Sequence, residues 1–548
     1  MNSGPGPDPH LTMSELPADT SLPLEEVTVG GLFLRRAEEN PDTTALIGTR
    51  YGSTEPVRLT YREAAEEVTR IATGLSRLAP PGSSVALWAP NVLEWPLIEY
   101  GAALAGVTLV ALNPVLRPAD LAYAVEHSGA SVLLYTERSR DYDMAAVVAE
   151  LAGSHPGLQT VPLTDRERWV APEADETVLA AAPTDPGAPV MLQYTSGTTG
   201  RPKGVLLSHR ALVNVARFTM TAVNAQPGAV AVNPLPMFHT AACVIGTLGP
   251  LWLGGTEILI EQFKPNAVLD VLRDENAEIL FYVPAILGAL LQTQRASDRP
   301  APQLKIVMGG ASNVSAAMIT GAEETFGATV INLFGQTELA PVLSATRPDD
   351  AREDLLTTVG RPLPQVDCKV VDPQTGEVVP VGVDGEICAR GYQQLLEYLH
   401  DPQATAATVD AQGYVHTGDL GRMDARGYLT VTGRLKELII RGGENIAPVA
   451  IEEALLDHPL VQAASVVGLP DERWGEIVAA VIVPAEPDVA DLAEALEAHL
   501  RERVAPYQIP ARWFVSEGLP ATPTGKIRKH AVVDQIGAQR LTEIGVAR

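Results

Sequence analysis

With 548 residues, the chain is too long for one compact core, so we expect a large domain of several hundred residues and a smaller one. Apolar residues make up 46% and charged residues 20% of the sequence, a balance that excludes a disordered or fibrous chain. The formal net charge of −27 argues against a nucleic-acid partner, because such binding depends on Lys and Arg displacing counterions from phosphates.

The N-terminal residues 1–27 lack a basic start followed by an apolar core, so they predict a disordered leader and not a secretion signal. The longest uncharged apolar run begins at Tyr100 and is shorter than the roughly 20 residues of a membrane span. The three cysteines, Cys243, Cys368 and Cys388, are too scattered for a disulfide framework or a CxxC metal site, and they predict buried reduced thiols. Together these features favour a cytoplasmic protein without a membrane span.

Between about Leu59 and Thr358, short apolar runs alternate with segments whose apolar residues recur at helical spacing, such as 62–78 and 265–277. The predicted strands begin near Ser84, Val107, Ser131, Ala229, Thr256, Glu278, Leu304 and Thr329. Such alternation indicates an α/β fold of βαβ units, with mainly parallel sheets buried under helices.

After Thr358 the pattern changes to short strands separated by Gly- and Asp-rich turns, which predicts a small antiparallel sheet or distorted barrel. The last part is predicted to be an α+β unit, with helices at 448–457 and 489–504 and strands at 463–468, 477–483 and near residue 513. We therefore divide the chain into a leader (1–27), a large N-terminal domain (28–433) and a small C-terminal domain (434–548).

The strongest local motif is YTSGTTGRPKG, residues 194–204, which follows an apolar run. Backbone N–H groups and hydroxyls in such a turn can surround the oxygens of a polyphosphate, and Lys203 adds a positive charge. The string does not match the GxxxxGK[ST] pattern of a Walker-type loop.

This motif resembles the phosphate-binding loop of the adenylate-forming superfamily, which includes acyl-CoA synthetases, luciferases and the adenylation domains of peptide synthetases. The resemblance extends over about residues 28–530, with the other signatures of the family in the expected order. The phosphate contacts that it implies are Thr195, Ser196, Gly197, Thr198, Thr199 and Lys203.

The segment NLFGQTE, residues 332–338, resembles the part of these enzymes that holds adenine and metal. The resemblance implies that Phe334 lies on the adenine, that Thr337 contacts phosphate and that Glu338 holds Mg²⁺. A carboxylate beside a polyphosphate indeed requires a hard cation between them. Further nucleotide contacts that the resemblance implies in this region are Gly310, Ala311, Asn332, Gly335 and Gln336.

Three later motifs complete the resemblance. In YVHTGDL, residues 414–420, Asp419 resembles the residue that accepts hydrogen bonds from the ribose hydroxyls. In GRLKELIIRGGENIAP, residues 433–448, Arg434 resembles a second ribose and phosphate contact, and Lys436 lies at the family's hinge. PTGKIRK carries Lys526, whose ammonium would offset the charge that builds up when a carboxylate attacks the α-phosphate.

Members of the family form the adenylate with the small domain in one orientation and the thioester with it rotated, which we expect here as domain alternation about Lys436. Gly442 and Gly443 have no side chains, so the backbone there can approach the pantetheine arm of coenzyme A closely. A plain hairpin turn is the alternative explanation for this glycine pair.

His239 resembles the aromatic or His gate of acyl-CoA synthetases, and we count it among the catalytic candidates with Lys526, Thr337 and Glu338. The residues expected around the acyl pocket are small and apolar, namely Ala241, Ala242, Cys243, Gly309, Gly310, Ala311, Ala340 and Val342. Because no Arg or Lys is among them, we expect an apolar monocarboxylic acid, either aromatic, polycyclic or fatty.

The resemblance thus implies an ATP-dependent ligase that converts an acid and ATP to acyl-AMP and pyrophosphate, and then transfers the acyl group to coenzyme A. Two alternatives stay open: a chain that performs one half-reaction, for example thioester formation from a preformed acyl-adenylate, and a non-catalytic adenylate-binding scaffold. The sequence leaves the oligomeric state open, with a homodimer as one option. Its Arg-rich, Lys-poor, Ala-rich composition is compatible with a high-GC bacterium and with specialised metabolism.

Overall fold

The computed structural model describes residues 10–195, 201–310, 314–442, 444–486, 489, 491–521 and 527–545. The chain divides into two compact units. The first unit comprises Met1–Leu16, Lys369–Cys388 and His416–Arg548, and the second comprises Pro17–Cys368 and Ala389–Val415. The domain boundary that we placed after residue 433 lies inside the first unit and stays a prediction.

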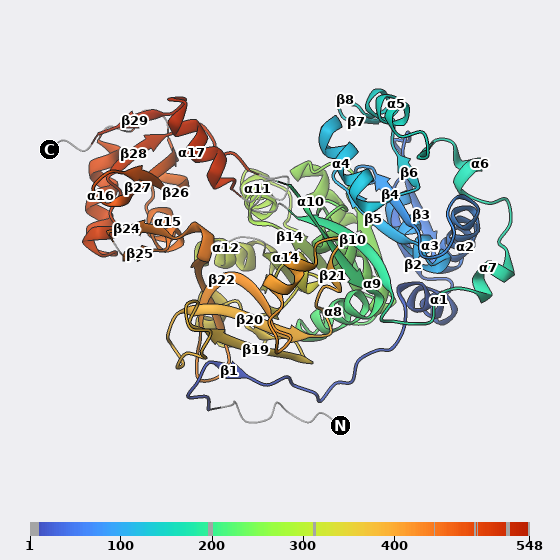
Figure 1. Cartoon of the computed structure of the whole chain (residues 1–548), viewed down its shortest axis with the longest axis horizontal. Helices are drawn as coiled ribbons and strands as arrows, with labels where there is room; N and C mark the ends of the chain where they lie inside the picture. The colour runs from blue at the N-terminus through green and yellow to red at the C-terminus, as the bar shows by residue number, and fades with distance from the viewer. Residues whose placement is uncertain are drawn as a thin grey trace. The chain divides into compact units, whose positions relative to one another are not determined.

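The second unit contains a sheet with the strand order β21-β11-β10-β5-β4-β6-β9. Figure 1 labels β21, β10, β5, β4 and β6 of this sheet. Its strands are β4 (Ser84–Trp88), β5 (Thr108–Leu112), β6 (Val132–Tyr135), β9 (Gln159–Pro162), β10 (Pro189–Thr195), β11 (Lys203–Ser208) and β21 (Glu397–Tyr398). Strands β10, β5, β4, β6 and β9 run parallel, whereas β11 pairs antiparallel with both β10 and β21 at one edge. Helices α3 (Glu94–Ala105) and α4 (Pro118–Ser128) pack against β5, as the alternating sequence pattern predicted.

A second sheet in the same unit has the order β18-β17-β16-β15-β14-β12-β13-β2-β3. Its strands are β2 (Thr44–Thr49), β3 (Pro56–Thr60), β12 (Val230–Asn233), β13 (Thr256–Leu259), β14 (Ile279–Tyr282), β15 (Ile306–Gly310), β16 (Thr329–Phe334), β17 (Ser344–Ala345) and β18 (Arg361–Pro362). Each pair of neighbouring strands from β16 to β2 is parallel. Along the chain, most of these apolar strands are separated by helices. The predicted α/β class with mainly parallel sheets is confirmed.

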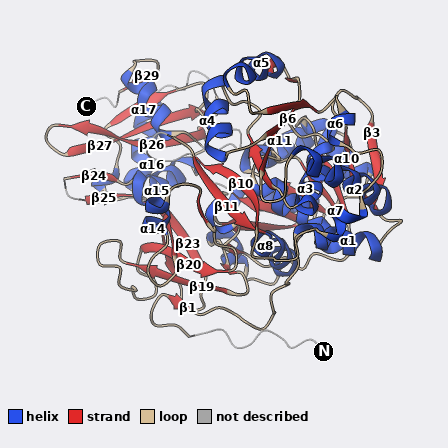
Figure 2. Cartoon of the chain, turned by 45° about the vertical axis from the view of Figure 1, so that its right-hand side comes forward, coloured by secondary structure: helices blue, strands red, loops and turns tan. Residues whose placement is uncertain are grey.

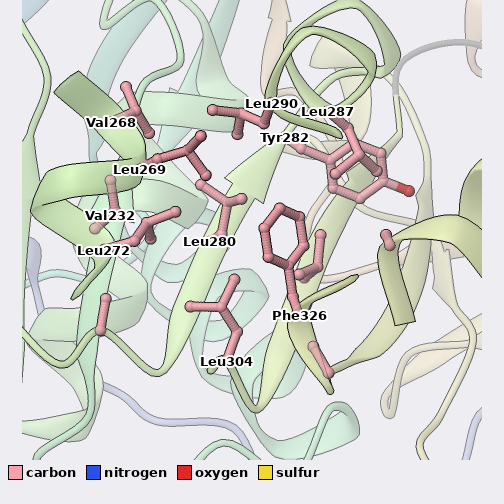
Figure 3. Packing of buried hydrophobic residues seen from close by; sticks show 14 of the residues in the cluster. Val232, Val268, Leu269, Leu272, Leu280, Tyr282, Leu287, Leu290, Leu304 and Phe326 are labelled. Carbon is pink, nitrogen blue, oxygen red and sulfur yellow. The ribbon is translucent and has the colours of Figure 1, made fainter. Parts of the chain in front are cut away.

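The core on this second sheet is packed from several of its strands and from the helices between them (Figure 3). Leu280 and Tyr282 of β14 lie among the apolar faces of α10 (Pro265–Asp274), α11 (Pro284–Arg295) and α12 (Ala316–Phe326). The largest of these helix side chains is Phe326, which is fully buried. Burial of such side chains is worth roughly 1.5–3 kcal/mol each, so this cluster holds the strand ends in place.

In the first unit a further sheet has the order β1-β19-β20-β22-β23. Its strands are β1 (Glu15–Leu16), β19 (Val366–Val371), β20 (Gly385–Gly391), β22 (Val415–Met423) and β23 (Leu429–Arg434), and β22 runs antiparallel to β23. This is the small sheet that the Gly- and Asp-rich turns predicted.

For residues 10–27, strand β1 and its neighbours correct our expectation of a disordered leader, whereas residues 1–9 lie outside the described residues. The backbone N–H of Ser14 donates to Val379, and the carbonyl of Ser14 accepts from Val370. Residues 17–27 are also bonded, since Glu25 donates its backbone N–H to Asn214 in the second unit. Composition alone missed this, because a polar segment is ordered here by backbone pairing with strands far away in sequence.

The C-terminal part of the first unit contains β24 (Ile439–Arg441), β25 (Glu444–Ile446), β26 (Val461–Asp471), β27 (Gly475–Pro484), β28 (Arg512–Val515) and β29 (Thr542–Ile544). Its helices are α15 (Pro448–Leu456), α16 (Leu492–Arg501) and α17 (Lys529–Gly537), with α15 and α17 packed on β26 (Figure 2). The predicted α+β arrangement is confirmed, while α17 and β29 were not predicted.

The three cysteines, all described, are buried and form no disulfide, as the sequence predicted. Burial raises the pKa of the Cys368 thiol to about 12, so this group stays protonated and unreactive. Among the described residues, no helix combines the length and apolar composition needed to cross a membrane.

Candidate active site

The candidate residues of the second unit gather at the carboxyl ends of its parallel strands. Strand β15 ends at Gly310 beside Leu333 of β16, and Gly309 lies beside Tyr282 of β14. A Cβ on Gly310 would lie 2.1 Å from the carbonyl oxygen of Leu333, so a side chain is excluded there. The backbone is therefore bare at the sheet edge where ligands bind in open α/β folds.

Strand β16 carries Asn332 and Phe334 to this same edge. The side-chain oxygen of Asn332 accepts from the hydroxyl of Tyr282 at 3.2 Å, and its backbone N–H donates to Thr346 at 2.9 Å. Phe334 is the last residue of the strand and is half-buried. The next residue, Gly335, has no room for a Cβ, which would lie 2.1 Å from the carbonyl oxygen of Pro341.

After Gln336 the chain forms a short 3₁₀ turn, η2 (Thr337–Leu339), that presents Glu338. Oε1 of Glu338 accepts a hydrogen bond of 2.7 Å from the hydroxyl of Tyr398. The ring of the same tyrosine faces Lys203, whose Nζ lies 4.5 Å from the ring centroid. The structure thus brings the predicted phosphate lysine and the predicted metal ligand together on one aromatic side chain.

Strands β10 and β11 form an antiparallel pair in which Thr195 lies opposite Lys203. The motif of residues 194–204 therefore bridges two paired strands, with its ends fixed by the sheet. Seven candidates lie outside the described residues: Ser196, Gly197, Thr198, Thr199, Ala311, Gly443 and Lys526. Their roles stay predictions.

His239 follows β12 and precedes a π-helical segment, η1 (Ala241–Gly246). The carbonyl of His239 accepts hydrogen bonds from the backbone N–H groups of Ala242 and Cys243. These two bonds lie at the start of the π-helical segment. π-Helical turns are rare and occur frequently at functional sites. Burial lowers the pKa of His239 to about 4, so its imidazole is neutral at physiological pH.

In the first unit, Asp419 of β22 lies opposite Arg434 of β23 in the strand register. Oδ1 of Asp419 is 2.7 Å from Nε of Arg434, and the Asp419 side chain is only 3% exposed. The two predicted ribose contacts are therefore an ion pair, which gives the buried Asp419 carboxylate a cationic partner.

A second carboxylate holds the turn before Asp419. Glu386 of β20 accepts from the backbone N–H of Gly418 at 3.0 Å, and its other oxygen lies 2.7 Å from Nδ1 of His416. Cys388 lies beside them, with Sγ 3.5 Å from the same Nδ1. Although these three side chains bring metal-ligating atoms within 4.8 Å of one another, the Glu386–His416 hydrogen bond and the Cys388 contact account for their proximity.

Gly442 lies in the turn between β24 and β25, where its φ is +60°. A Cβ there would lie 2.8 Å from the ring of Trp474, and the backbone N–H of Gly442 donates to the Trp474 carbonyl at 2.7 Å. The hairpin alone thus requires glycine at this position, so a contact with coenzyme A stays a prediction. Lys436 is exposed in a 3₁₀ turn, η3 (Leu435–Glu437), directly after Arg434.

The donor set around Glu338 fits Mg²⁺. This ion prefers hard oxygen ligands and is bound in proteins by one or two carboxylates together with substrate phosphates and water. Glu338, whose Oε1 accepts from Tyr398, could supply such a carboxylate, and Lys203 could supply a cation for the phosphates. The residues present therefore suit a metal-bound polyphosphate.

Sequence reasoning missed Tyr398, Tyr282 and the pair formed by Glu386 and His416. Tyr398 belongs to none of the motifs, and it reaches Glu338 because β21 pairs with β11, nearly 200 positions earlier. His416 lies inside the motif of residues 414–420, but its partner Glu386 comes from another strand. Only strand pairing reveals such partners.

Comparison with known families gives two matches. Residues 33–399 match the family of AMP-binding enzymes, and residues 450–526 match the C-terminal domain of the same enzymes.

Two curated relatives and one solved structure resemble the chain over nearly its whole length. A feruloyl-CoA synthase of Amycolatopsis sp is 36% identical over 521 residues, covering 93% of this chain and 99% of its own. The putative acyl-CoA synthetase YngI of Bacillus subtilis (strain 168) is 32% identical over 535 residues, covering 92% and 96%. A crystal structure of ATP-bound MatB from Rhodopseudomonas palustris has a TM-score of 0.79 and 26% identity, covering 92% and 98%.

Proposed function

Because the chain belongs to the family of AMP-binding enzymes and is an AMP-forming acid–CoA ligase, we propose that it activates an apolar monocarboxylic acid, either aromatic, polycyclic or fatty. In the first step the acid's carboxylate attacks the α-phosphorus of ATP, so that acyl-AMP forms and pyrophosphate leaves. In the second step the thiol of coenzyme A, losing its proton, attacks the acyl carbon, and AMP leaves as the thioester forms.

The observation that carries the acid class is the composition of the segment at the end of β12. Residues 235–246 contain no Asp, Glu, Lys or Arg, and burial keeps His239 uncharged. An apolar segment without a fixed cation offers nothing to hold a second carboxylate and nothing anionic to hold an α-amine. The feruloyl-CoA synthase relative, whose acid is aromatic, is consistent with this class.

We assign the nucleotide to the residues that the motifs predict. Lys203 and the loop of residues 194–204 hold the phosphates, Phe334 lies on the adenine, and Asp419 with Arg434 holds the ribose. Glu338 would hold Mg²⁺, which would supply positive charge to the phosphate oxygens. Lys526 contributes a further positive charge near the attacking carboxylate.

We further propose that both half-reactions belong to this chain. Lys526 acts in the first, and the backbone at Gly442 and Gly443 lines the path of coenzyme A in the second, with rotation about Lys436 between them. A cytoplasmic location is part of the same proposal, whereas a homodimer and a place in bacterial specialised metabolism stay options that the sequence leaves open.

The acid class is tested by measuring formation of CoA esters across a panel of aromatic, polycyclic, fatty, dicarboxylic and amino acids. We expect the highest kcat/KM among the first three classes. A preference for a dicarboxylic or amino acid would contradict the assignment.

The two-step mechanism is tested with Lys526→Ala. Acid-dependent exchange of labelled pyrophosphate into ATP should fall by roughly 100-fold or more, because a charge that stabilises the transition state is lost. Thioester formation from supplied acyl-adenylate should be largely kept. Equal loss of both activities would contradict alternation, and absence of exchange in the wild type with its best acid would favour a single half-reaction.

A further inference from the structure

Tyr398 lies between two groups that the proposed function places on the polyphosphate and its metal. It occupies β21, which pairs antiparallel with β11 so that Tyr398 lies opposite Val205, two residues after Lys203. The side chain is 5% exposed, although both of its neighbours across the site are charged. Tyr398 thus makes two different polar contacts, one through its hydroxyl with a carboxylate and one through its ring with an ammonium.

The hydroxyl is the first of these contacts. It donates to Oε1 of Glu338 at 2.7 Å, the short distance typical of an O–H bonded to a carboxylate. Burial, with the nearby charge of Glu338, raises the pKa of the Tyr398 hydroxyl above its usual range. A tyrosine hydroxyl is protonated at physiological pH, so the phenol donates to Glu338.

The ring is the second contact. Nζ of Lys203 lies 4.5 Å from the ring centroid, within the distance at which an ammonium is attracted to the face of an aromatic ring. This contact orients a long, flexible side chain without neutralising its charge. Lys203 therefore stays available to an anionic ligand.

The backbone around Tyr398 connects the same elements. The N–H of Leu395 donates to the carbonyl of Glu338 at 2.9 Å, and that of Leu396 donates to Leu206 of β11 at 2.8 Å. The N–H of Tyr398 itself donates to Thr405 at 3.0 Å. The segment is thus bonded both to η2, which carries Glu338, and to the strand that begins at Lys203, so the position of Tyr398 is well determined.

We propose that Tyr398 is a positioning residue for the metal–nucleotide complex: its hydroxyl orients the Glu338 carboxylate toward the metal, and its ring orients Lys203 toward the phosphates. The inference rests on the proposed function, since it assumes that ATP and a divalent cation bind at these two residues. Tyr398 itself acts through its neighbours and does not touch the reacting atoms.

The two contacts can be separated by substitution. Tyr398→Phe removes the hydroxyl and keeps the ring, whereas Tyr398→Leu removes both. Tyr142→Phe is a matched control, because it removes a part-buried hydroxyl that donates to the backbone carbonyl of Leu116 in another part of the unit. Thermal unfolding of each variant identifies any general loss of folding.

Binding is measured without turnover, using Mn²⁺ as the spectroscopic probe and α,β-methylene-ATP as the nucleotide. Electron paramagnetic resonance gives the affinity for Mn²⁺ at saturating analogue, and calorimetry in EDTA gives the affinity for the analogue alone. In Tyr398→Phe we expect Mn²⁺ affinity to fall about tenfold, as is typical when a partner of a metal ligand is lost, with analogue affinity in EDTA unchanged. In Tyr398→Leu both affinities should fall.

A double-mutant cycle distinguishes positioning from a structural role. If the hydroxyl acts through the carboxylate, Tyr398→Phe should weaken Mn²⁺ binding no further in a Glu338→Gln background. Unchanged Mn²⁺ affinity in Tyr398→Phe, or additive losses in the double variant, would overturn the proposal. Failure of the wild type to bind the analogue with Mn²⁺ would instead contradict the proposed nucleotide site.

Discussion

Glu386 and His416 are joined by a hydrogen bond of 2.7 Å across the strands β20 and β22, three residues before Asp419. The two atoms that this hydrogen bond joins are Nδ1 of His416 and Oε2 of Glu386. The second oxygen of Glu386 accepts the backbone N–H of Gly418. The Glu386 carboxylate thereby holds both His416 and Gly418, the two ends of the short segment directly before Asp419.

We expect Glu386→Gln to raise the KM for ATP about tenfold, because losing one charge-assisted hydrogen bond costs about 1.5 kcal/mol or more and loosens this segment. The measurement is steady-state kinetics with varied ATP at saturating acid and CoA. Asp384→Asn is the control, since Asp384 is about half-exposed in its ion pair with Arg422. A lowered melting temperature with an unchanged KM for ATP would mean that Glu386 only stabilises the fold.

Two buried glutamates predict how stability depends on pH. Glu257 is 1% exposed, and burial raises its pKa to about 8, although Asn233 and Thr247 both donate to its Oε1. Burial, reinforced by the charge of Glu257, also raises the pKa of Glu99 well above its ordinary value. The folded protein therefore keeps protons that the unfolded chain releases, so its free energy of unfolding falls as pH rises from about 4.5 to about 8.

Glu257→Gln should remove its part of this dependence, because an amide is neutral at every pH and keeps an oxygen acceptor. The stability of the variant relative to wild type should increase as pH rises through this range, by at most about 1.4 kcal/mol per pH unit. Urea unfolding at several pH values measures it, with the exposed Glu472→Gln as control. A constant difference between variant and wild type would show that Glu257 is ionised in the folded state.

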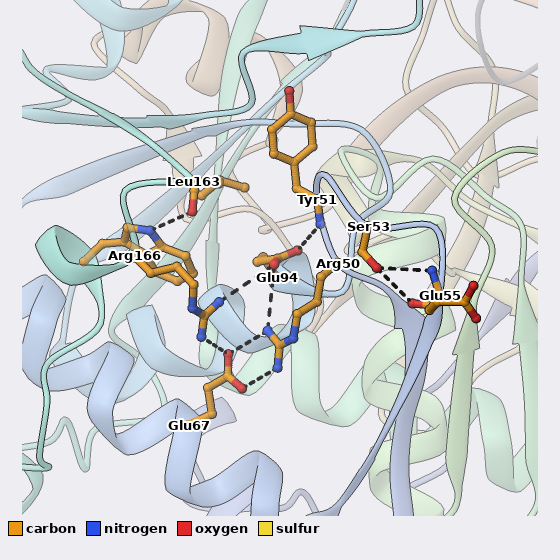
Figure 4. A network of polar contacts seen from close by, with 9 residues as sticks. Arg50, Tyr51, Ser53, Glu55, Glu67, Glu94, Leu163 and Arg166 are labelled. Carbon is orange, nitrogen blue, oxygen red and sulfur yellow. Dashed lines mark hydrogen bonds and ion pairs between the residues drawn. The ribbon is translucent and has the colours of Figure 1, made fainter.

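An arginine–glutamate network predicts a site of structural sensitivity in the second unit (Figure 4). Glu67, whose side chain is 12% exposed, receives two hydrogen bonds from Arg50, at 2.6 and 2.9 Å, and one from Arg166 at 2.7 Å. Burial alone would raise the pKa of Glu67, but the two guanidiniums outweigh it and lower the pKa. Glu94 lies 3.8 Å from both arginines.

Glu67→Gln should lower the free energy of unfolding by about 3 kcal/mol, because it leaves partly buried positive charges without their main partner. Asp42→Asn is the contrasting control, since its ion pair with Arg62 is exposed and should be worth less than about 1 kcal/mol. Urea unfolding checks both. Equal effects of the two substitutions would mean that solvent screens the network as it screens the surface pair.

The low pKa of His239 predicts the shape of a pH profile. Since burial holds this pKa at about 4, the residue does not titrate between about pH 5 and 8. We expect kcat/KM for the acid to follow the same shape in that range for wild type and His239→Gln, while the KM for the acid changes and that for ATP does not. An inflection near pH 6.5 that disappears in the variant would contradict a neutral, gating role.

Much of this protein follows from local sequence. The predicted strands near Ser84, Glu278 and Thr329 are β4, β14 and β16, because continuous apolar runs between helical patterns are typical of buried parallel strands. The nucleotide-binding residues could be proposed from the sequence because each motif is contiguous, so that Phe334 and Glu338 belong to one string of residues.

Long-range pairing was decided only by the tertiary structure. Periodicity cannot tell that β1 joins a sheet, that Tyr398 reaches Glu338, or that Glu386 holds His416, because each of these contacts joins segments far apart in the chain. Likewise, the requirement for glycine at Gly442 comes from the ring of Trp474 packed against it. The residue types of each motif can be read from a short stretch of sequence. The strand register that orients these side chains and the burial that shifts their pKa values arise only when distant segments pack together.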